Sequence, residues 1–252
     1  MVTVMLTQER RKKILEYIGE NGSASVVTLT GLLNASESTV RRDLAALASL
    51  GKLNKVHGGA TVLPHEFLNQ EDNINSKVQK NFDEKSDIAE YAASLINDDD
   101  FVYIDAGSTT YLMTRHIAET KATFVTNGIA HAQELAKKGC RVIILGGDLK
   151  DTTEAIIGIV AATNLQKYNF SKAFIGINGI TVKQGFTTTD TDEAMIKAIA
   201  IERSFISYIL SDSSKFGKVS AVTVAPLEAS CIVCGKCSDN AIKEKTVVKE
   251  VR

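Results

Sequence analysis

The chain has 252 residues, of which 44% are hydrophobic and 23% are charged, and its formal net charge is −1. These values are typical of a folded globular protein and exclude bulk disorder. No apolar run reaches the ~18 residues that a membrane-spanning helix requires, and the N-terminal residues lack the layout of a secretory signal. We therefore expect a cytoplasmic protein with one large domain or two smaller ones.

Charge is distributed unevenly along the chain. Residues 1–60 contain eight basic and five acidic side chains (+3), whereas the remainder contains twenty-one basic and twenty-five acidic side chains (−4). A basic head on an acidic body suggests two domains and a polyanionic partner for the head. Such a charge difference is common, so a DNA-binding role for the head has to be supported by its individual residues.

The first sixty residues predict three short helices and a hairpin. Apolar spacing predicts helices over residues 7–20, 25–33 and 36–50, with Thr7 and Ser36 as their caps. Residues 52–60 alternate polar and apolar side chains and end in a glycine turn, as in a short β-hairpin. Three helices followed by such a hairpin form a winged helix-turn-helix, a fold that binds duplex DNA.

The third predicted helix has two different faces. Its apolar stripe would pack on the first two helices, and comprises Val40, Leu44, Leu47 and Leu50. The opposite face could enter the major groove, where arginine pairs with guanine and hydroxyl groups reach phosphates or base edges. The candidate DNA contacts on this helix and the hairpin are Ser36, Ser38, Thr39, Arg41, Arg42, Lys52, Lys55 and His57. A solvated face of an ordinary three-helix bundle is the alternative interpretation.

From residue 83 the predicted strands and helices alternate, which indicates an α/β domain with a mostly parallel sheet covered on both faces. The predicted strands span residues 101–105, 122–126, 141–145, 172–177, 207–210 and 221–224, with a last strand around Cys231 and a frayed basic tail. The predicted helices span residues 84–95, 109–119, 129–138, 155–165 and 192–204. We therefore assign residues 1–62 to the winged helix-turn-helix, 63–82 to a linker with a possible helical piece, and 83–252 to the α/β domain.

Glycine and polar residues recur where the predicted strands end. The segment 105–110 reads Asp-Ala-Gly-Ser-Thr-Thr between an apolar strand and a helix, and its amides, hydroxyls and helix N-terminus could hold a phosphate. A well-capped strand–helix turn would have the same residues. Because open α/β sheets bind ligands at this edge, the candidates are Asp105, Gly107, Ser108, Thr109, Thr110, Thr126, Asn127, Gly146, Gly147, Gly176, Asn178, Asp212 and Lys215.

Three cysteines, Cys231, Cys234 and Cys237, have a spacing that can ligate zinc or an iron–sulfur cluster. No second cysteine pair or histidine pair completes a four-ligand set, and Cys140 is distant in the sequence. A terminal strand and the turn after it explain the same residues. We expect neither a metal nor another cofactor, and disulfides are disfavoured in a reducing cytosol.

The head resembles the N-terminal signature of the DeoR family (DeoR/GlpR type) of bacterial transcription regulators. The resemblance rests on Ser36-Glu37-Ser38-Thr39-Val40-Arg41-Arg42-Asp43-Leu44, Gly51-Lys52-Leu53 and Val56-His57-Gly58-Gly59-Ala60. It implies a local salt bridge for Asp43. The second part resembles the sensor domain of the same family at Lys85, Ile104-Asp105, Gly107-Ser108-Thr109-Thr110, Val125-Thr126-Asn127, Leu145-Gly146-Gly147, Gly158, Ala173-Phe174-Ile175-Gly176, Glu193-Ala194, Lys197 and Asp212-Ser213-Ser214-Lys215.

This resemblance implies a sensor similar in fold to ribose-5-phosphate isomerase, with a sugar phosphate as its ligand. Ser108, Thr109 and Thr110 would hold the phosphate, and Lys85 and Lys197 would add cationic contacts unless they are plain surface lysines. Asp105, Asn127 and Asp212 would bind sugar hydroxyls or line the pocket.

The resemblance favours a regulator over an enzyme. Isomerisation needs a carboxylate base at the reacting carbons, and where the isomerases have an acidic segment this chain reads Ile177-Asn178-Gly179-Ile180. Glu193 is the nearest spare carboxylate, in the setting of a helix start. The expected function is a homodimeric or homotetrameric repressor, released from operator DNA by a sugar phosphate. Residues 63–71 and 152–158 resemble fructose-operon repressors of the family, which favours fructose 1-phosphate over tagatose 6-phosphate or another ketose phosphate.

Overall fold

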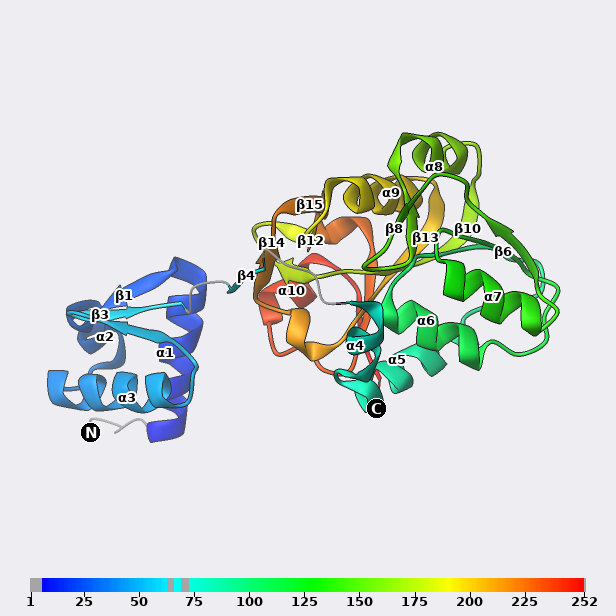
Figure 1. The fold of residues 1–252 in the computed structure, drawn as a ribbon. Helices are drawn as coiled ribbons and strands as arrows, with labels where there is room; N and C mark the ends of the chain where they lie inside the picture. Colours follow the sequence, from blue (N-terminus) through cyan, green and yellow to red (C-terminus); the bar gives the residue numbers. More distant parts are fainter. Residues whose placement is uncertain (1–5, 63–65, 69–72, 252) are drawn as a thin grey trace. The chain divides into compact units, whose positions relative to one another are not determined.

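The computed structural model describes residues 6–62, 66–68 and 73–251. It divides the chain into two compact units, Met1–His65 and Glu66–Arg252, and each is described by itself (Figure 1). Among the described residues, no helix is both long and apolar enough to cross a membrane.

The first unit contains three helices and a small antiparallel sheet. The helices are α1 (Thr7–Asn21), α2 (Val26–Leu33) and α3 (Glu37–Ser49), and the strands are β1 (Ser23–Ser25), β2 (Asn54–Val56) and β3 (Gly59–Thr61), in the order β1-β3-β2. The predicted winged arrangement is confirmed. Strand β1 was not predicted. Its short polar segment has no alternating pattern, and it is a strand only because it pairs with β3, which lies far away in the chain.

Three local details of this unit differ from expectation. Thr7 is the first residue of α1 rather than its cap, since Leu6 holds the capping position. Ser25 precedes α2 and caps it, accepting the Thr28 N–H at 3.0 Å. Leu50 is 65% exposed because α3 ends one residue before it, so the apolar stripe of α3 ends at Leu47.

The second unit is built around a seven-stranded sheet in its described part, with the strand order β17-β16-β13-β10-β5-β6-β7. Every neighbouring pair in this sheet is parallel. The strands are β5 (Phe101–Ile104), β6 (Thr123–Thr126), β7 (Arg141–Ile144), β10 (Phe170–Gly176), β13 (Ser204–Ser211), β16 (Cys231–Cys234) and β17 (Val248–Glu250). The predicted α/β class with a mostly parallel sheet is therefore confirmed.

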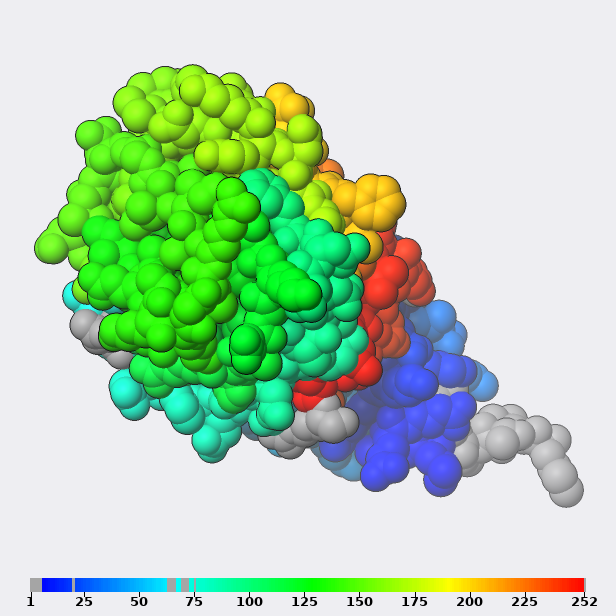
Figure 2. Space-filling view, turned by 90° about the vertical axis from the view of Figure 1, so that its right-hand side faces the viewer, coloured from blue at the N-terminus to red at the C-terminus, as the bar shows by residue number. Residues whose placement is uncertain are grey.

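Helices cover both faces of this sheet, each over its own apolar core. One face carries α4 (Ile74–Gln79), α5 (Phe82–Ser94), α6 (Ser108–His116) and α7 (Ile129–Lys137). The other face carries α8 (Gly158–Leu165), α9 (Thr191–Glu202) and α10 (Asn240–Lys245). Figure 2 shows the side of the unit where the green part of the chain, including α6 and α7, lies outermost, with α8 at the upper edge.

The strand order reverses between β5 and β10. From β5 the chain proceeds outward through β6 to β7, and from β10 it proceeds the other way through β13 and β16 to β17. The loops after β5 and β10 therefore lead to opposite faces of the sheet and leave a crevice between them at the strands' carboxyl ends.

Several smaller elements surround that crevice. Three short sheets are formed by β11 (Gly179–Thr181), β12 (Gly185–Thr188) and β15 (Val222–Ala225); by β14 (Lys218–Ser220) and β4 (Glu66–Leu68); and by β8 (Asp148–Lys150) and β9 (Ala155–Ile157). Two short 3-10 turns, η1 (Ser213–Lys215) and η2 (Leu227–Ala229), complete the elements of the described chain.

Three expectations for this unit were wrong. Residues 155–157 form a strand, and helix α8 begins only at Gly158, where φ is +88°. The strand predicted over residues 221–224 belongs to a small antiparallel sheet and not to the main one. The tail is ordered as α10 and β17, because β17 completes the sheet edge beside β16. The segment expected as a linker with a possible helical piece does contain a helix, α4, and its residues 66–68 form β4.

Candidate nucleic-acid interface and ligand pocket

Helix α3 presents its predicted polar face to solvent. Ser38, Arg41 and Arg42 are exposed, whereas Val40 and Leu44 are buried in the core of the first unit. An i,i+4 pair joins the Arg41 guanidinium to Glu37 at 3.2 Å, and both side chains are more than half exposed. Such exposed pairs contribute little to stability, so the arginine can exchange this partner for another acceptor.

The start of α3 is held by hydroxyl groups. The Ser36 hydroxyl caps the helix by accepting the Thr39 N–H at 3.3 Å, and lies 2.9 Å from the hydroxyls of both Ser38 and Thr39. This confirms the predicted cap. The three hydroxyls form one polar cluster at the helix N-terminus, where phosphate oxygens bind favourably.

Asp43 fixes α3 against α1 from within the unit. Its carboxylate is 2% exposed and accepts hydrogen bonds from the guanidinium groups of Arg10 at 2.5 Å and Arg11 at 3.0 Å. A salt bridge was expected of Asp43, and the structure places the two arginines on α1. Asp43 therefore orients the helix itself and not the arginines of its exposed face.

The hairpin β2–β3 forms the wing. Its turn consists of His57 and Gly58, and Gly58 has a φ of +81°, which favours glycine. Lys52, Lys55 and His57 are all exposed. They lie where a wing can contact the backbone of bound DNA.

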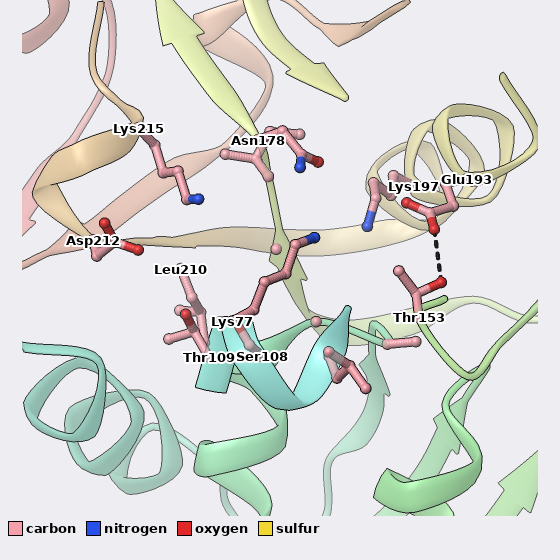
Figure 3. Close-up of a pocket in the computed structure, with 15 residues that line it drawn as sticks. Lys77, Ser108, Thr109, Thr153, Asn178, Glu193, Lys197, Leu210, Asp212 and Lys215 are labelled. Carbon is pink, nitrogen blue, oxygen red and sulfur yellow. Dashed lines mark hydrogen bonds between the residues drawn. The ribbon is translucent and has the colours of Figure 1, made fainter. Parts of the chain in front are cut away.

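The second unit contains a pocket at the carboxyl ends of β5, β10 and β13, that is, at the crevice where the strand order reverses (Figure 3). Counted together with the open space at its mouth, the pocket has a volume of about 510 Å³. The residues that line it are Ile74, Lys77, Ala106, Gly107, Ser108, Thr109, Thr153, Gly176, Ile177, Asn178, Glu193, Lys197, Leu210, Asp212 and Lys215.

Charged side chains enter this pocket from several elements. In Figure 3, Lys77 of α4 lies near the middle, with Asp212 and Lys215 to one side of it and Glu193 and Lys197 to the other. Three ammonium groups and two carboxylates thus line one pocket, so the lining offers contacts both to an anionic group and to hydroxyl groups. The carboxylates between them can accept hydrogen bonds from hydroxyl groups.

The loop after β5 provides the N-terminal end of α6. Ser108 and Thr109 line the pocket as the first residues of that helix, where the first N–H groups have no partner within the helix. Thr110 is fully buried and stabilises the turn, since its hydroxyl accepts the Gly107 N–H at 2.9 Å and donates to the Asp105 carbonyl at 2.6 Å. Thr110 therefore shapes the loop and does not face the pocket.

A buried ion pair lies beneath the loop. The Lys197 ammonium is 2.6 Å from the Asp105 carboxylate, and the two residues are 5% and 1% exposed. The same Asp105 oxygen accepts the Gly176 N–H at 3.0 Å. Asp105 thus ties the end of β5 to the end of β10 and to α9, while Lys197 also lines the pocket.

A second buried lysine supports the loop from behind. The Lys85 ammonium donates to the Lys77 carbonyl at 2.5 Å and to the Ser108 hydroxyl at 3.3 Å, and lies 3.9 Å from Asp212. Burial lowers the pKa of Lys85 to about 8, although Asp212 opposes this. For Asp212, burial is outweighed by the Ser214 hydrogen bond and by the nearby lysines, which lower the pKa of its carboxyl.

Most of the chain matches two models of one protein family. The model described as the DeoR C terminal sensor domain matches residues 80–235, and the model described as the DeoR-like helix-turn-helix domain matches residues 10–66. The chain belongs to the DeoR family. It is therefore a DNA-binding transcription regulator and not an enzyme.

Relatives match this DeoR-family regulator over nearly its whole length. The uncharacterized HTH-type transcriptional regulator FruR of Bacillus subtilis (strain 168) is 40% identical, covering 98% of this chain and 100% of that protein. The lactose phosphotransferase system repressor of Streptococcus mutans is 32% identical, covering 94% of each chain. Among solved structures, a ribose 5-phosphate isomerase from Methanocaldococcus jannaschii superposes with a TM-score of 0.41 at 16% identity, over 54% of this chain and 55% of that one. Similarity at that level says nothing about a ligand.

Some of the residues predicted for the DeoR-family pocket lie away from it. Asn127 accepts the Ala106 N–H at 2.9 Å and so positions the loop, and Thr126 accepts the Gly128 N–H at 3.1 Å. Gly146 and Gly147 are also outside the lining. The reason is the strand order, because these residues follow β6 and β7, on the side of β5 away from the crevice.

The structure also adds pocket residues that the sequence did not single out for binding. Lys77 and Ile74 belong to the segment expected as a linker, and Thr153 follows β8. Glu193, recognised only as a spare carboxylate, accepts hydrogen bonds from the Thr153 hydroxyl and the Lys150 ammonium, both at 2.9 Å. Only the folding of these segments over the crevice brings them together, so the sequence carried no local signal for them.

His131 of α7 supports the pocket loop from the side opposite the ligand space. Its Nε2–H donates to the Gly107 carbonyl at 3.0 Å, and within the described residues its Nδ1 has no partner. The ring packs on Gly128, where an added Cβ would lie 2.3 Å from Nδ1. Burial lowers the pKa of His131 to about 4, which keeps the ring neutral.

The four cysteines of this DeoR-family chain lie in or next to strands of the main sheet. Strand β16 begins at Cys231 and ends at Cys234, and Cys237 is buried just after it. Cys140 is buried just before β7, at the opposite edge of the sheet. Burial raises the pKa of Cys234 to about 12, so its thiol stays protonated. No group of three or more candidate metal ligands occurs among the described residues.

Proposed function

We propose that this DeoR-family regulator represses a sugar uptake or catabolic operon and is released from its operator by a sugar phosphate. The observation that carries the proposal is the pocket in which Ser108 and Thr109, at the N-terminus of α6, face the ammonium groups of Lys77, Lys197 and Lys215. Fructose 1-phosphate is the favoured inducer, and tagatose 6-phosphate is the alternative.

The chemistry of the pocket suits a ligand with one anionic end and several hydroxyls. Backbone N–H groups, hydroxyls and the helix dipole at a helix N-terminus stabilise a phosphate. Asn178, Glu193 and Asp212 line the same space and offer amide and carboxylate groups to hydroxyls. The name of the 40% identical relative, FruR, and the sugar system named for the Streptococcus mutans repressor agree with a sugar-derived ligand.

On the DNA side, we propose that α3 enters the major groove. Arg41 and Arg42 would read base edges, and the hydroxyl cluster of Ser36, Ser38 and Thr39 would contact phosphates. Lys52, Lys55 and His57 of the wing would contact the flanking backbone. Helix-turn-helix operators are read by symmetric dimers, so a homodimer or homotetramer is the expected form.

The ligand regulates only if its affinity differs between the DNA-bound and released arrangements. Allosteric coupling of this kind is typically about 1–3 kcal/mol, or roughly 5- to 150-fold in operator affinity. A ligand that releases a repressor from its operator must bind the released arrangement more tightly than the DNA-bound one. The ligand therefore lowers operator affinity.

Thermal-shift measurement on the full chain tests the ligand class. Fructose 1-phosphate, tagatose 6-phosphate, fructose and inorganic phosphate are compared in parallel. We expect a large stabilisation by one sugar phosphate, a weak one by inorganic phosphate and none by fructose. Stabilisation by another compound but not by fructose 1-phosphate would replace the favoured inducer, and stabilisation by no sugar phosphate would remove the proposal.

A substitution in the pocket links that binding to the site. Thr109→Val removes a hydroxyl that lines the pocket, and Thr163→Val removes an exposed hydroxyl on α8, far from it, as the matched control. We expect Thr109→Val to weaken sugar phosphate binding without changing operator affinity, and Thr163→Val to change neither. Wild-type induction in Thr109→Val would argue against this loop as the phosphate site.

A further inference from the structure

The short helix α4 forms a wall of the ligand pocket. Ile74 and Lys77 line the pocket directly, although α4 lies in the segment that follows the DNA-binding unit rather than in the βα framework of the sheet. A second, smaller cavity of about 380 Å³ including its mouth, here called the side cavity, is lined by Ile74, Val78, Tyr111, Ala130, His131, Thr153 and Glu154. Helix α4 therefore stands between the pocket and the side cavity.

Contacts with the sensor hold α4 in this place. The Ile74 N–H donates to the Thr152 carbonyl at 3.1 Å, and the Lys77 carbonyl accepts the Lys85 ammonium at 2.5 Å. Val78 is buried against the core beneath α5 and α6. A helix of this length is too short to be stable by itself, so its formation depends on these contacts and on whatever occupies the pocket.

The strand before α4 is attached near the pocket as well. β4 pairs in parallel with β14, which begins shortly after Lys215 and Asp212 of the pocket. The described parts of the segment between the DNA-binding unit and α5 are thus anchored on elements that carry ligand-facing side chains. The DNA-binding unit ends at His65, and this segment is its covalent connection to the sensor.

We propose that α4 is the ligand-reading wall of the pocket, that Lys77 contacts the anionic ligand, and that the ligand regulates operator binding by fixing α4 on the sensor. This proposal rests on the proposed function, because it assumes an anionic ligand in the pocket. An anion near the Lys77 ammonium stabilises α4 in its docked position, so ligand binding and α4 docking are linked. Because α4 lies in the stretch of chain that joins the DNA-binding unit to the sensor, its docked and undocked states would differ in operator affinity.

The first test replaces the charge of Lys77 in the full chain. Lys77→Met keeps most of the apolar stem and removes the ammonium, and Lys80→Met is the matched control, since Lys80 is exposed just beyond α4. Calorimetry with fructose 1-phosphate should show an affinity about 10- to 100-fold lower for Lys77→Met, the usual effect of losing a charged hydrogen bond, and no change for Lys80→Met. Wild-type affinity in Lys77→Met would overturn the contact.

The second test asks whether bound ligand still releases the protein from DNA in Lys77→Met, independently of how tightly the ligand binds. The probe is the duplex that the wild-type protein selects from a random-sequence pool, and each variant is measured without fructose 1-phosphate and at its own saturating concentration. We expect Lys77→Met to bind the duplex normally without ligand and to be released less than wild type when saturated. Full release of saturated Lys77→Met from the duplex would overturn the proposal that the ligand regulates operator binding through α4.

The third test observes α4 directly in the wild-type protein. Hydrogen exchange should slow in Ile74–Gln79 when fructose 1-phosphate is added, and should stay unchanged in Asn240–Lys245 (α10), a helix of the same length away from the pocket. Val78→Ala removes methyl groups that pack in the core and line the side cavity but not the ligand pocket, and should raise the ligand concentration needed for release. Unchanged exchange in α4, or wild-type induction in Val78→Ala, would overturn the proposal. If no sugar phosphate binds the wild type, the proposed function fails before these variants are compared.

Discussion

The ammonium of Lys197 lies 2.6 Å from the carboxylate of Asp105 at the base of the ligand pocket, and both residues are buried. One lysine thus serves two purposes, since it neutralises a carboxylate that joins β5 to β10 and also lines the pocket. The pocket is therefore preorganised by the same interaction that ties together the ends of these two adjacent parallel strands.

Removing Lys197 should destabilise the sensor strongly. Lys197→Met leaves Asp105 buried without its counter-charge, which typically costs about 3–5 kcal/mol in the free energy of unfolding. The control is Lys243→Met, which breaks an exposed pair with Glu250 at 3.0 Å and should cost less than about 1 kcal/mol. Urea unfolding of the full chain measures both. Equal, small losses in the two variants would show that Asp105 does not depend on Lys197.

Asp43 should matter for the fold of the DNA-binding unit. Asp43→Ala leaves the guanidinium groups of Arg10 and Arg11 without their shared, buried acceptor, and we expect a loss of about 3 kcal/mol from that unit. Faster hydrogen exchange in α1 would report it. Glu16→Ala, which removes the exposed partner of Lys12, is the control and should leave exchange unchanged. Normal protection of α1 in Asp43→Ala would contradict this role.

Arg41 should contribute to operator binding without contributing to stability. Arg41→Ala removes an exposed side chain that pairs with the exposed Glu37, and should weaken specific operator binding by about 1–3 kcal/mol if the arginine reads a guanine. Gel-shift titration against specific and random duplexes at one salt concentration measures the effect. Lys12→Ala on α1 is the control for a lost positive charge. An equal loss on both duplexes would make Arg41 a phosphate contact and not a base contact.

His131 should make the sensor sensitive to mild acid. Its pKa is lowered from 6.5 to about 4 in the folded state, chiefly by burial, so the unfolded chain binds the proton more tightly. The contribution of neutral His131 to the free energy of unfolding is fully present above about pH 6.5. It is lost as the pH falls toward 4, which lowers the free energy of unfolding by up to about 3 kcal/mol. Urea midpoints at pH 7.5 and pH 5 should therefore differ less in His131→Gln than in the wild type. His116→Gln, an exposed histidine of α6, should behave as the wild type does. An unchanged pH dependence in His131→Gln would exclude this group.

Local chemistry determined the elements of the head almost to the residue. The spacing of Val40, Leu44 and Leu47, a serine cap and a glycine stop predicted a helix over residues 36–50, and α3 spans Glu37–Ser49. These signals act within a few residues of the chain, so the sequence shows them directly. At the helix ends of the same unit, the errors at Thr7, Ser25 and Leu50 are of one residue, whereas strand β1, which depends on pairing with β3, was missed.

The pocket could be predicted only in part. The sequence indicated that strand ends would carry ligand groups, and Ser108, Thr109 and Asn178 do line the pocket. It gave no means to separate Asn178 from Asn127, since both follow a strand and both carry an amide. Strand order separates them, because β10 meets β5 at the reversal and β6 lies on the other side of β5.

The sequence by itself determined that this chain has a winged DNA-binding head and a parallel α/β sensor, because periodicity, caps and motifs are properties of neighbouring residues. Only the tertiary structure decided which lysines are buried, that Asp43 holds α1, and that α4 forms a wall of the pocket. These features depend on contacts between residues far apart in the chain, where burial changes the energy of a charge and packing selects one of many possible partners.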